Sequence, residues 1–131
     1  WGRNQQGQLG DGTTTDRNVP VAVSGELTFS SINPSIWHSC AVTTAGVGYC
    51  WGFNSYGQLG DGTTTDSNVP VAVSPDAVGV SIASITGGFY HSCGLTTAGD
   101  GYCWGLNSSG QLGNGTTTDS LVPGLVTDPS S

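Results

Sequence analysis

The strongest constraint on the fold of this chain is that its sequence repeats. The string GQLGDGTTTD occupies residues 7–16 and again 57–66, and it returns at 110–119 with Asn114 in place of the first aspartate. These strings lie inside longer matching segments that start at residues 1, 51 and 104, and a second type of segment, at 37–50 and 90–103, lies between them. Such a period predicts a repeat architecture. We therefore divide the chain into repeats at 1–50 and 51–103 and a half repeat at 104–131, with the extra residues of the second interval near 75–77.

Within each repeat, apolar residues fall in short blocks that are typical of strands. Residues 27–32 and 80–85 alternate apolar residues with Ser or Thr, which is the period of a strand. No segment shows a sustained helical period or a helix cap followed by an apolar stripe. Four strands in a unit of about fifty residues predict an all-β fold made of β-propeller blades with four antiparallel strands each. The further expected strands are 19–23, 37–43, 47–53, 90–96 and 100–106.

The repeated motifs also resemble those of a known family. WGxNxxGQLGxGTTTD, then VPxxV, then HSCxxTTxGxxYCWG is similar to the repeats of the regulator of chromosome condensation family, in a bacterial-type, secreted-looking form. The resemblance spans nearly the whole chain and implies a β-propeller, commonly of seven blades. About two and a half repeats, the first starting in mid-blade, make an incomplete ring, because propellers need ~4–8 blades. We expect a longer parent chain to supply the rest, with self-assembly through open blade edges as the alternative.

Each full repeat carries two cysteines ten residues apart, Cys40 with Cys50 and Cys93 with Cys103. A three-residue hairpin loop that ends in glycine, centred on Ala45, places Cys40 opposite Cys50. In that register the two form a non-hydrogen-bonded pair, whose Cα atoms are close enough for a disulfide. The same count pairs Cys93 with Cys103.

Free thiols and a structural zinc site are the alternatives to these disulfides. His38 and His91 each stand two residues before a cysteine on the same strand face, so a Cys–His ligand set is conceivable, although the close CxxC spacing of most zinc sites is absent. Disulfides predict an oxidising compartment, and we therefore expect an extracellular or cell-surface location, or the periplasm.

The glycine-rich string raises the question of a phosphate or metal loop. A phosphate loop needs a lysine and a following helix, and this chain has no lysine and continues into a proline and a strand. Calcium is an alternative that would use Asp11, Asp16, Asp61 and Asp66. We favour a connector between blades, in which glycines supply unusual backbone angles, aspartates form Asx turns, and the leucine of each copy, Leu9, Leu59 or Leu112, fills the blade core.

No residue pattern predicts catalysis or a cofactor. His38 and His91 each precede a serine directly, so the two side chains of each pair point to opposite strand faces and cannot act on one another. We interpret both histidines as structural, tying a strand to the loop of the next blade. We expect neither catalytic residues nor a cofactor, and no metal beyond the calcium alternative.

Contact residues are sought at positions where the repeats differ. Arg3, Phe53 and Tyr56 vary in the WGxNxx segments, and Trp37 and Tyr90 precede each HSC. These five residues are our candidates for binding a protein partner.

Charge and composition limit the partners. Two arginines against nine acids give a net charge of −7, so neither nucleic acid nor an anionic membrane surface is expected as a partner. No apolar run approaches the ~18 residues of a membrane span. We predict a non-catalytic protein-interaction or scaffold module of a larger extracellular propeller or repeat array, with further blades or another protein as partner. The alternatives are a binder that inhibits a secreted enzyme, as one member of the resembled family does, and a carbohydrate-binding propeller.

Overall fold

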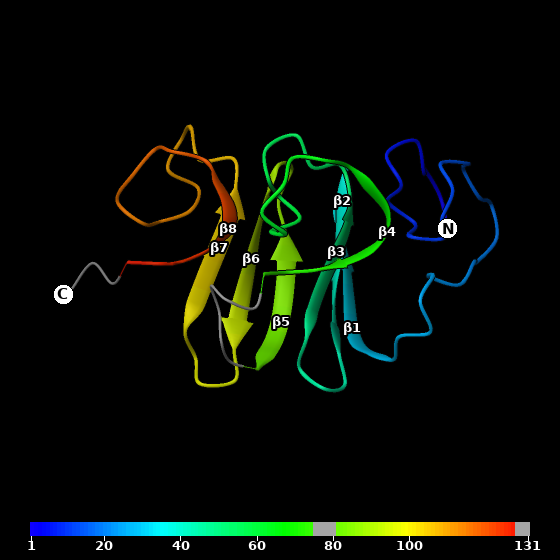
Figure 1. Cartoon of the computed structure of the whole chain (residues 1–131), viewed down its shortest axis with the longest axis horizontal. Coiled ribbons are helices and arrows are strands. Elements are labelled where there is room, and N and C mark those ends of the chain that lie inside the picture. Colours follow the sequence, from blue (N-terminus) through cyan, green and yellow to red (C-terminus); the bar gives the residue numbers. More distant parts are fainter. Residues whose placement is uncertain (75–80, 128–131) are drawn as a thin grey trace.

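The chain folds into two antiparallel four-stranded sheets that stand side by side (Figure 1). The computed structural model describes residues 1–74 and 81–127. In each sheet the strands neighbour one another in chain order, and the described residues contain no helix. The predicted all-β fold with four-stranded blades is therefore confirmed. The first sheet holds β1 (Phe29–Pro34), β2 (His38–Thr43), β3 (Gly48–Gly52) and β4 (Ser67–Ala72), and the second holds β5 (Ile82–Gly87), β6 (His91–Thr96), β7 (Gly101–Gly105) and β8 (Ser120–Leu125).

The central hairpin of each sheet has the register expected from its loop. The backbone N–H of Thr43 donates to the Val47 carbonyl, with an N···O distance of 2.9 Å, and Gly46 takes a φ of 81° that glycine adopts without strain. Counting outward from this bond places Cys40 opposite Cys50. The Cα atoms of that pair lie 4.1 Å apart, those of the equivalent pair in the second sheet lie 4.0 Å apart, and both pairs form disulfides.

The main hydrophobic core lies at the junction of the two sheets. Leu59, from the loop after β3, is fully buried there with Ile85 of β5 and Trp104 of β7. Gly48 allows the close approach, because a Cβ at this position would lie 2.7 Å from the Cδ1 of Ile85. The predicted burial of the leucine thus holds for Leu59 and for Leu112, whereas the first-copy equivalent, Leu9, is only partly buried.

One expected strand is wrong. Residues 19–23 form no strand, and the β-bridge found in this first copy, among the described residues, joins Gly2 to Arg17. The equivalent strand β4 pairs with Tyr49 and Cys50 of β3, and the positions equivalent to those two residues fall before Trp1. A strand needs a neighbour to satisfy its backbone groups, so this copy stays irregular.

The sheets are offset from the sequence repeats. The first sheet runs from β1 to β4 and crosses the boundary drawn at residue 50, so the division into 1–50, 51–103 and 104–131 describes the sequence period and stays a prediction. The extra residues near 75–77, and Val80 of the expected strand 80–85, lie outside the described residues.

Candidate functional site

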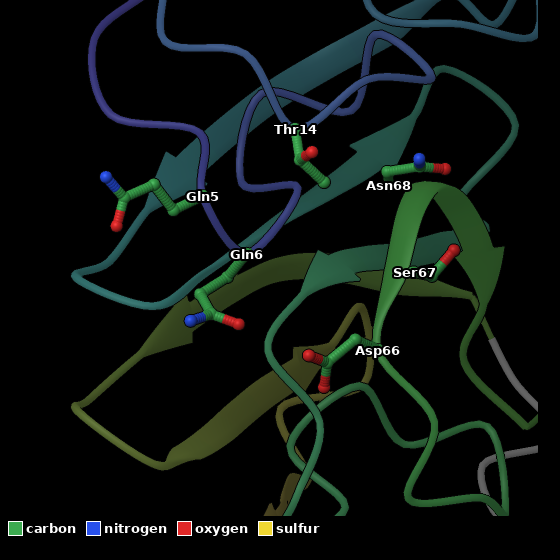
Figure 2. A pocket seen from close by; sticks show the side chains of 6 residues that line it. All are labelled: Gln5, Gln6, Thr14, Asp66, Ser67 and Asn68. Carbon is green, nitrogen blue, oxygen red and sulfur yellow. The ribbon is translucent and has the colours of Figure 1, made fainter.

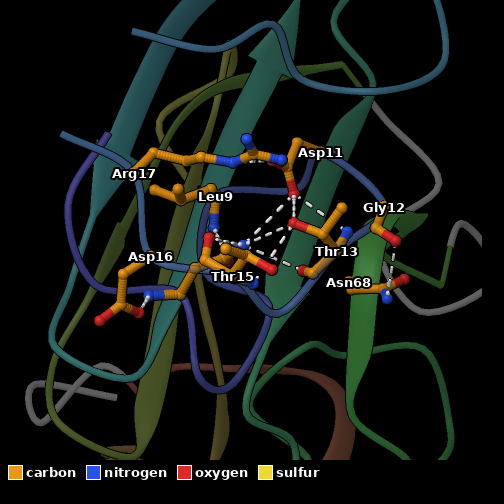
Figure 3. Close-up of polar contacts among 9 residues, drawn as sticks. Leu9, Asp11, Gly12, Thr13, Thr15, Asp16, Arg17 and Asn68 are labelled. Atoms are coloured by element: carbon orange, nitrogen blue, oxygen red, sulfur yellow. Dashed lines mark hydrogen bonds and ion pairs between the residues drawn. The ribbon is translucent and has the colours of Figure 1, made fainter. Parts of the chain in front are cut away.

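Each glycine-rich loop is folded around one buried asparagine. The side chain of Asn4 donates from Nδ2 to Oδ1 of Asp11 at 3.2 Å and to the Thr13 carbonyl at 3.0 Å, and its Oδ1 accepts from the backbone N–H of Leu9 at 2.9 Å. The backbone N–H of Asn4 donates to Oδ1 of Asp16 at 2.7 Å. Figure 3 draws the polar contacts of this loop as dashed lines, with Leu9, Asp11, Thr13 and Asp16 among the labelled residues. Both aspartates therefore close the loop on itself.

Asp11 makes an Asx turn, as the sequence indicates. Its Oδ1 accepts from the Thr13 backbone N–H at 3.0 Å and from the Thr13 hydroxyl at 2.6 Å, and its Oδ2 lies 3.3 Å from Nε of Arg17. The hydroxyl of Thr13 is the main reason why the pKa of Asp11 lies below its ordinary value. In the third copy Asn114 accepts from the N–H and hydroxyl of Thr116 at 3.1 and 2.7 Å, so a neutral amide closes this turn as well as a carboxylate does.

The calcium alternative stays a prediction. Asp61 and Asp66 of the second copy accept from Asn54 as Asp11 and Asp16 do from Asn4. Within residues 1–74 and 81–127 no three His, Cys, Asp or Glu side chains are grouped so that they could hold a metal ion.

In the first two copies the GQLG part of the loop is bonded to the sheet that follows it. The Gln58 carbonyl accepts from Nε1 of Trp104 at 2.9 Å and from the hydroxyl of Ser92 at 2.7 Å. Gly60 has a φ of 72°, and a Cβ there would lie 2.6 Å from Nε1 of Trp104. The first copy repeats the arrangement, since the Gln8 carbonyl accepts from Trp51 and Ser39, both at 2.8 Å. The string is a connector between blades.

The two histidines lie in different environments. His38 is fully buried, and its Nε2 lies 2.8 Å from the Ser92 hydroxyl on the other sheet. Because Ser92 gives its only hydroxyl proton to the Gln58 carbonyl, Nε2 of His38 is the donor in this bond. Burial, and to a lesser degree the charge of His91, lowers the pKa of His38 to about 4. His91 is partly exposed, and burial lowers its pKa too.

The pairing of His38 with Ser92 was not visible in the sequence, where each histidine stands beside a different serine. The serine proton points away from the imidazole, and both side chains are buried, so the pair has the geometry of a tie between β2 and β6. His38 therefore ties β2 to the next blade, as expected. Its partner lies on strand β6 of that blade, and not on the loop that the sequence interpretation named.

The five predicted contact residues come together on one surface. The guanidinium carbon of Arg3 lies 5.2 Å from the ring centre of Trp37, and the Trp37 and Phe53 rings are 6.4 Å apart. Phe53 lies 6.4 Å from Tyr56 and 6.1 Å from Tyr90, and Tyr56 lies 5.2 Å from Tyr90. We name this surface the aromatic corner; it is formed by Arg3, Trp37, Phe53, Tyr56, Phe89 and Tyr90.

Phe89 is a member of the corner that no sequence pattern singled out. Its ring lies 6.4 Å from that of Tyr90, and 61% of the residue is exposed. It also forms one wall of a pocket of about 240 Å³ between the β1–β2 and β5–β6 turns. We name it the turn pocket; its lining residues are Ser35, Ile36, Gly87, Gly88 and Phe89.

A second, polar pocket of about 270 Å³ lies between the first glycine-rich loop and the start of β4 (Figure 2). Gln5 connects it to the aromatic corner, because its Oε1 accepts from Nη2 of Arg3 at 3.1 Å. The pocket is lined by Gln5, Gln6, Thr14, Asp66, Ser67 and Asn68.

Comparison with known proteins agrees with the fold. The chain matches the Regulator of chromosome condensation (RCC1) repeat over residues 1–42, 46–95 and 98–131. It is 37% identical over 125 residues to the ultraviolet-B receptor UVR8 of Arabidopsis thaliana, covering 94% of this chain and 28% of that protein. No helix in the described part of the chain is long and apolar enough to cross a membrane.

Solved structures give the same result. Human WBSCR16 superposes with a TM-score of 0.84 at 28% identity, covering 98% of this chain and 34% of that one. Prp20p of Saccharomyces cerevisiae, described with its binding to Gsp1p and histones, superposes with a TM-score of 0.81 at 22% identity, covering 100% and 34%; this likeness shows the fold alone. The chain thus spans about a third or less of the length of these relatives.

Proposed function

The chain belongs to the Regulator of chromosome condensation (RCC1) repeat family, and from this premise we propose that it is a non-catalytic protein-interaction and scaffold module of a larger extracellular propeller or repeat array. Propellers of this family commonly mediate protein interaction. The observation that carries the proposal is the aromatic corner, in which residues from the loops beside both sheets form one partly exposed surface.

The composition of the corner supports protein binding. Tyr, Trp, Phe and Arg are the residues most enriched at the energetic centres of protein interfaces, because they offer large contact area with little loss of side-chain entropy. Here they occupy the repeat positions that differ between copies, whereas the connector string changes only at Asn114. The scaffold is thus separated from a surface whose side chains determine the partner.

The outer sides of the two sheets support assembly with further blades. Ile32 on the first sheet and Leu125 on the second are large apolar residues that remain exposed, although Ile85, the equivalent of Ile32 in the second sheet, is fully buried at the junction. Covering such surfaces releases water and stabilises an assembly.

The extracellular setting is supported by the two disulfides. Both pairs close short hairpins, and disulfides persist in oxidising compartments. Alkylation of native protein with and without reductant tests this: we expect thiols only after reduction, and four reactive thiols in the unreduced protein would contradict it.

A carbohydrate-binding propeller is the second candidate, and the polar pocket of Figure 2 favours it. Amide side chains of Gln5, Gln6 and Asn68 and the carboxylate of Asp66 line this pocket, with Trp37 close by through Arg3. Such groups can bind hydroxyls while an aromatic ring packs against a sugar face.

Capture experiments separate the two candidates. The immobilised chain, a Phe53→Ser/Tyr56→Ser variant and a Val47→Ser control are each exposed to secreted proteins and to a sugar array. We expect one identifiable protein to be retained by the wild type and the control and to be lost with the corner variant. If that protein is an enzyme whose turnover falls on binding, the chain acts as an inhibitor. Sugar binding that survives the corner variant, with no protein retained, would contradict the proposal.

A further inference from the structure

The turn pocket lies directly beside the aromatic corner. Its walls are the exposed side chains of Ile36 and Phe89, and Phe89 is the neighbour of Tyr90 in both chain and space. Its volume of about 240 Å³ is below the ~300–1,000 Å³ of pockets that hold whole small molecules. A pocket of this size and lining suits one apolar side chain.

Two glycines allow the turns that line the pocket to pack closely against their neighbours. A Cβ at Gly88 would lie within 2.7 Å of Nδ1 of His91, and a Cβ at Gly87 would lie 2.9 Å from the hydroxyl oxygen of Ser35 and 3.0 Å from Nε2 of His38. No side chain fits at either position without displacing these groups. The hollow between Ile36 and Phe89 is therefore built into the packing of the two turns.

Two aspartates lie next to the corner, and neither takes part in an ion pair within residues 1–74 and 81–127. Asp16 and Asp66 each accept from the backbone N–H of the residue that follows a corner residue, Asn4 after Arg3 and Asn54 after Phe53. The two arginines of the chain have partners within it: Arg3 lies over Trp37, and Arg17 pairs with Asp11.

The first half of the corner, Arg3 and Trp37, contains a cation of the chain, and the second half, Phe53, Tyr56 and Tyr90, does not. In the first half a cation of the chain, Arg3, lies over the aromatic ring of Trp37. In the second half the equivalent positions hold Phe53 and Tyr90, with Tyr56 exposed to 37% beside them. Aromatic faces next to a carboxylate attract a cation.

We propose that the turn pocket and the Tyr56–Tyr90 half of the corner together bind an exposed protein segment in which a lysine or arginine adjoins an apolar residue. The apolar side chain enters between Ile36 and Phe89, and the cation lies over Tyr56 near Asp66. This inference rests on the proposed function, since it names the chemistry of the protein partner.

Matched peptides test the proposal. Four short synthetic peptides share one Gly/Ser frame and differ only in a central pair: Leu-Lys, Leu-Gln, Leu-Glu or Ser-Lys. Each is titrated at low salt into the ¹⁵N-labelled full chain, and amide shifts are followed by NMR. We expect Leu-Lys to bind about fivefold more tightly than Leu-Gln, Leu-Glu to bind most weakly, and the shifts to centre on residues 53–56 and 87–90.

Two variants test where each residue of the central peptide pair binds. Phe89→Ser should lower the affinity for the Leu-Lys and Leu-Gln peptides equally. Tyr56→Ser should lower the affinity for Leu-Lys and leave the affinity for Leu-Gln nearly unchanged. Val47→Ser is the matched control, because Val47 is 43% exposed on the β2–β3 turn outside the corner. Since all three side chains are exposed, each variant should unfold at the wild-type denaturant concentration, which is measured alongside.

Equal affinity for Leu-Lys and Leu-Glu, or amide shifts that avoid the turn pocket, would overturn the inference. The proposed function fails separately. A secreted protein that is captured through the corner, together with peptides that are not discriminated, removes this inference and leaves the interaction module standing. If neither protein capture nor peptide binding is observed, both the proposed function and this inference are wrong.

Discussion

The junction between the sheets and the outer side of the second sheet are built from the same repeat positions, yet they differ chemically. At the junction His38 is fully buried, donates to Ser92 of the other sheet and has its pKa lowered to about 4. Its equivalent His91 is partly exposed. Among residues 1–74 and 81–127 the imidazole of His91 makes no hydrogen bond to a serine, whereas that of His38 does.

This difference shows that a blade gains its properties from its neighbour. The sequence around both histidines is nearly the same, so the buried imidazole and the low pKa follow from the presence of a second sheet. Changes at the junction should therefore cost more than identical changes at the outer side.

The largest expected contrast is between Leu59→Ala and Leu9→Ala. Leu59 is fully buried between the sheets, so its truncation leaves a cavity and should lower the free energy of unfolding by about 4 kcal/mol. Leu9 is only partly buried, and its truncation should cost about 1–2 kcal/mol. Urea denaturation measures both. Equal losses would mean that the sheet preceding Leu59, which has no described counterpart before Leu9, adds nothing to the packing of the leucine.

The next contrast is in pH dependence. His38 has a pKa of about 4 in the folded protein and the ordinary 6.5 when unfolded, so between these values the unfolded chain binds a proton that the folded chain does not. The free energy of unfolding should fall as the pH drops from 6.5 to 4, by about 3 kcal/mol from this group.

His38→Asn should remove most of that fall, whereas His91→Asn should keep it. The free energy of unfolding of the wild type and of both variants is measured by denaturation at several pH values. The difference between the wild type and each variant then removes the contribution of the carboxylates, which all three proteins share. A pH dependence that is unchanged in His38→Asn would contradict the assignment.

A smaller contrast is expected between Ser92→Ala and Ser39→Ala. The Ser92 hydroxyl accepts from His38 and donates to the Gln58 carbonyl, so its removal leaves a buried imidazole N–H unpaired and should cost about 2 kcal/mol. Ser39 donates only to the Gln8 carbonyl among the bonds in the described part, and its removal should cost about 1 kcal/mol. Thermal unfolding midpoints rank the two, and the reverse order would break the comparison.

Local features of the fold could be predicted from the sequence. The hairpin register around Ala45 follows from a short loop and one glycine, so the pairing of Cys40 with Cys50 can be found by counting. The blade architecture follows from the repeat period and the block length of apolar residues. The aspartate turns follow because each acts on a residue two positions away.

Features that depend on the packing of distant segments could not be predicted. His38 meets Ser92 only because the two sheets pack together, and no spacing in the chain encodes that distance. Phe89 was missed for the same reason, since its role comes from facing Ile36 across two turns. Residues 19–23 form no strand because a strand pattern in the sequence does not ensure that a neighbouring strand is present to pair with it.

The smallest expected contrast concerns the connector aspartates, Asp61→Asn against Asp11→Asn. Asn114 already fills this position in the third copy and makes the same bonds to Thr116, so Asp61→Asn should change the free energy of unfolding by less than about 0.5 kcal/mol. Asp11→Asn also removes the pairing with Arg17, whose side chain is partly exposed, and should cost up to about 1 kcal/mol. Both are measured with and without calcium. A calcium-dependent rise in the unfolding midpoint of the wild type that disappears in either variant would replace the turn interpretation with a metal site, because only a bound cation needs the charge that Asn114 lacks.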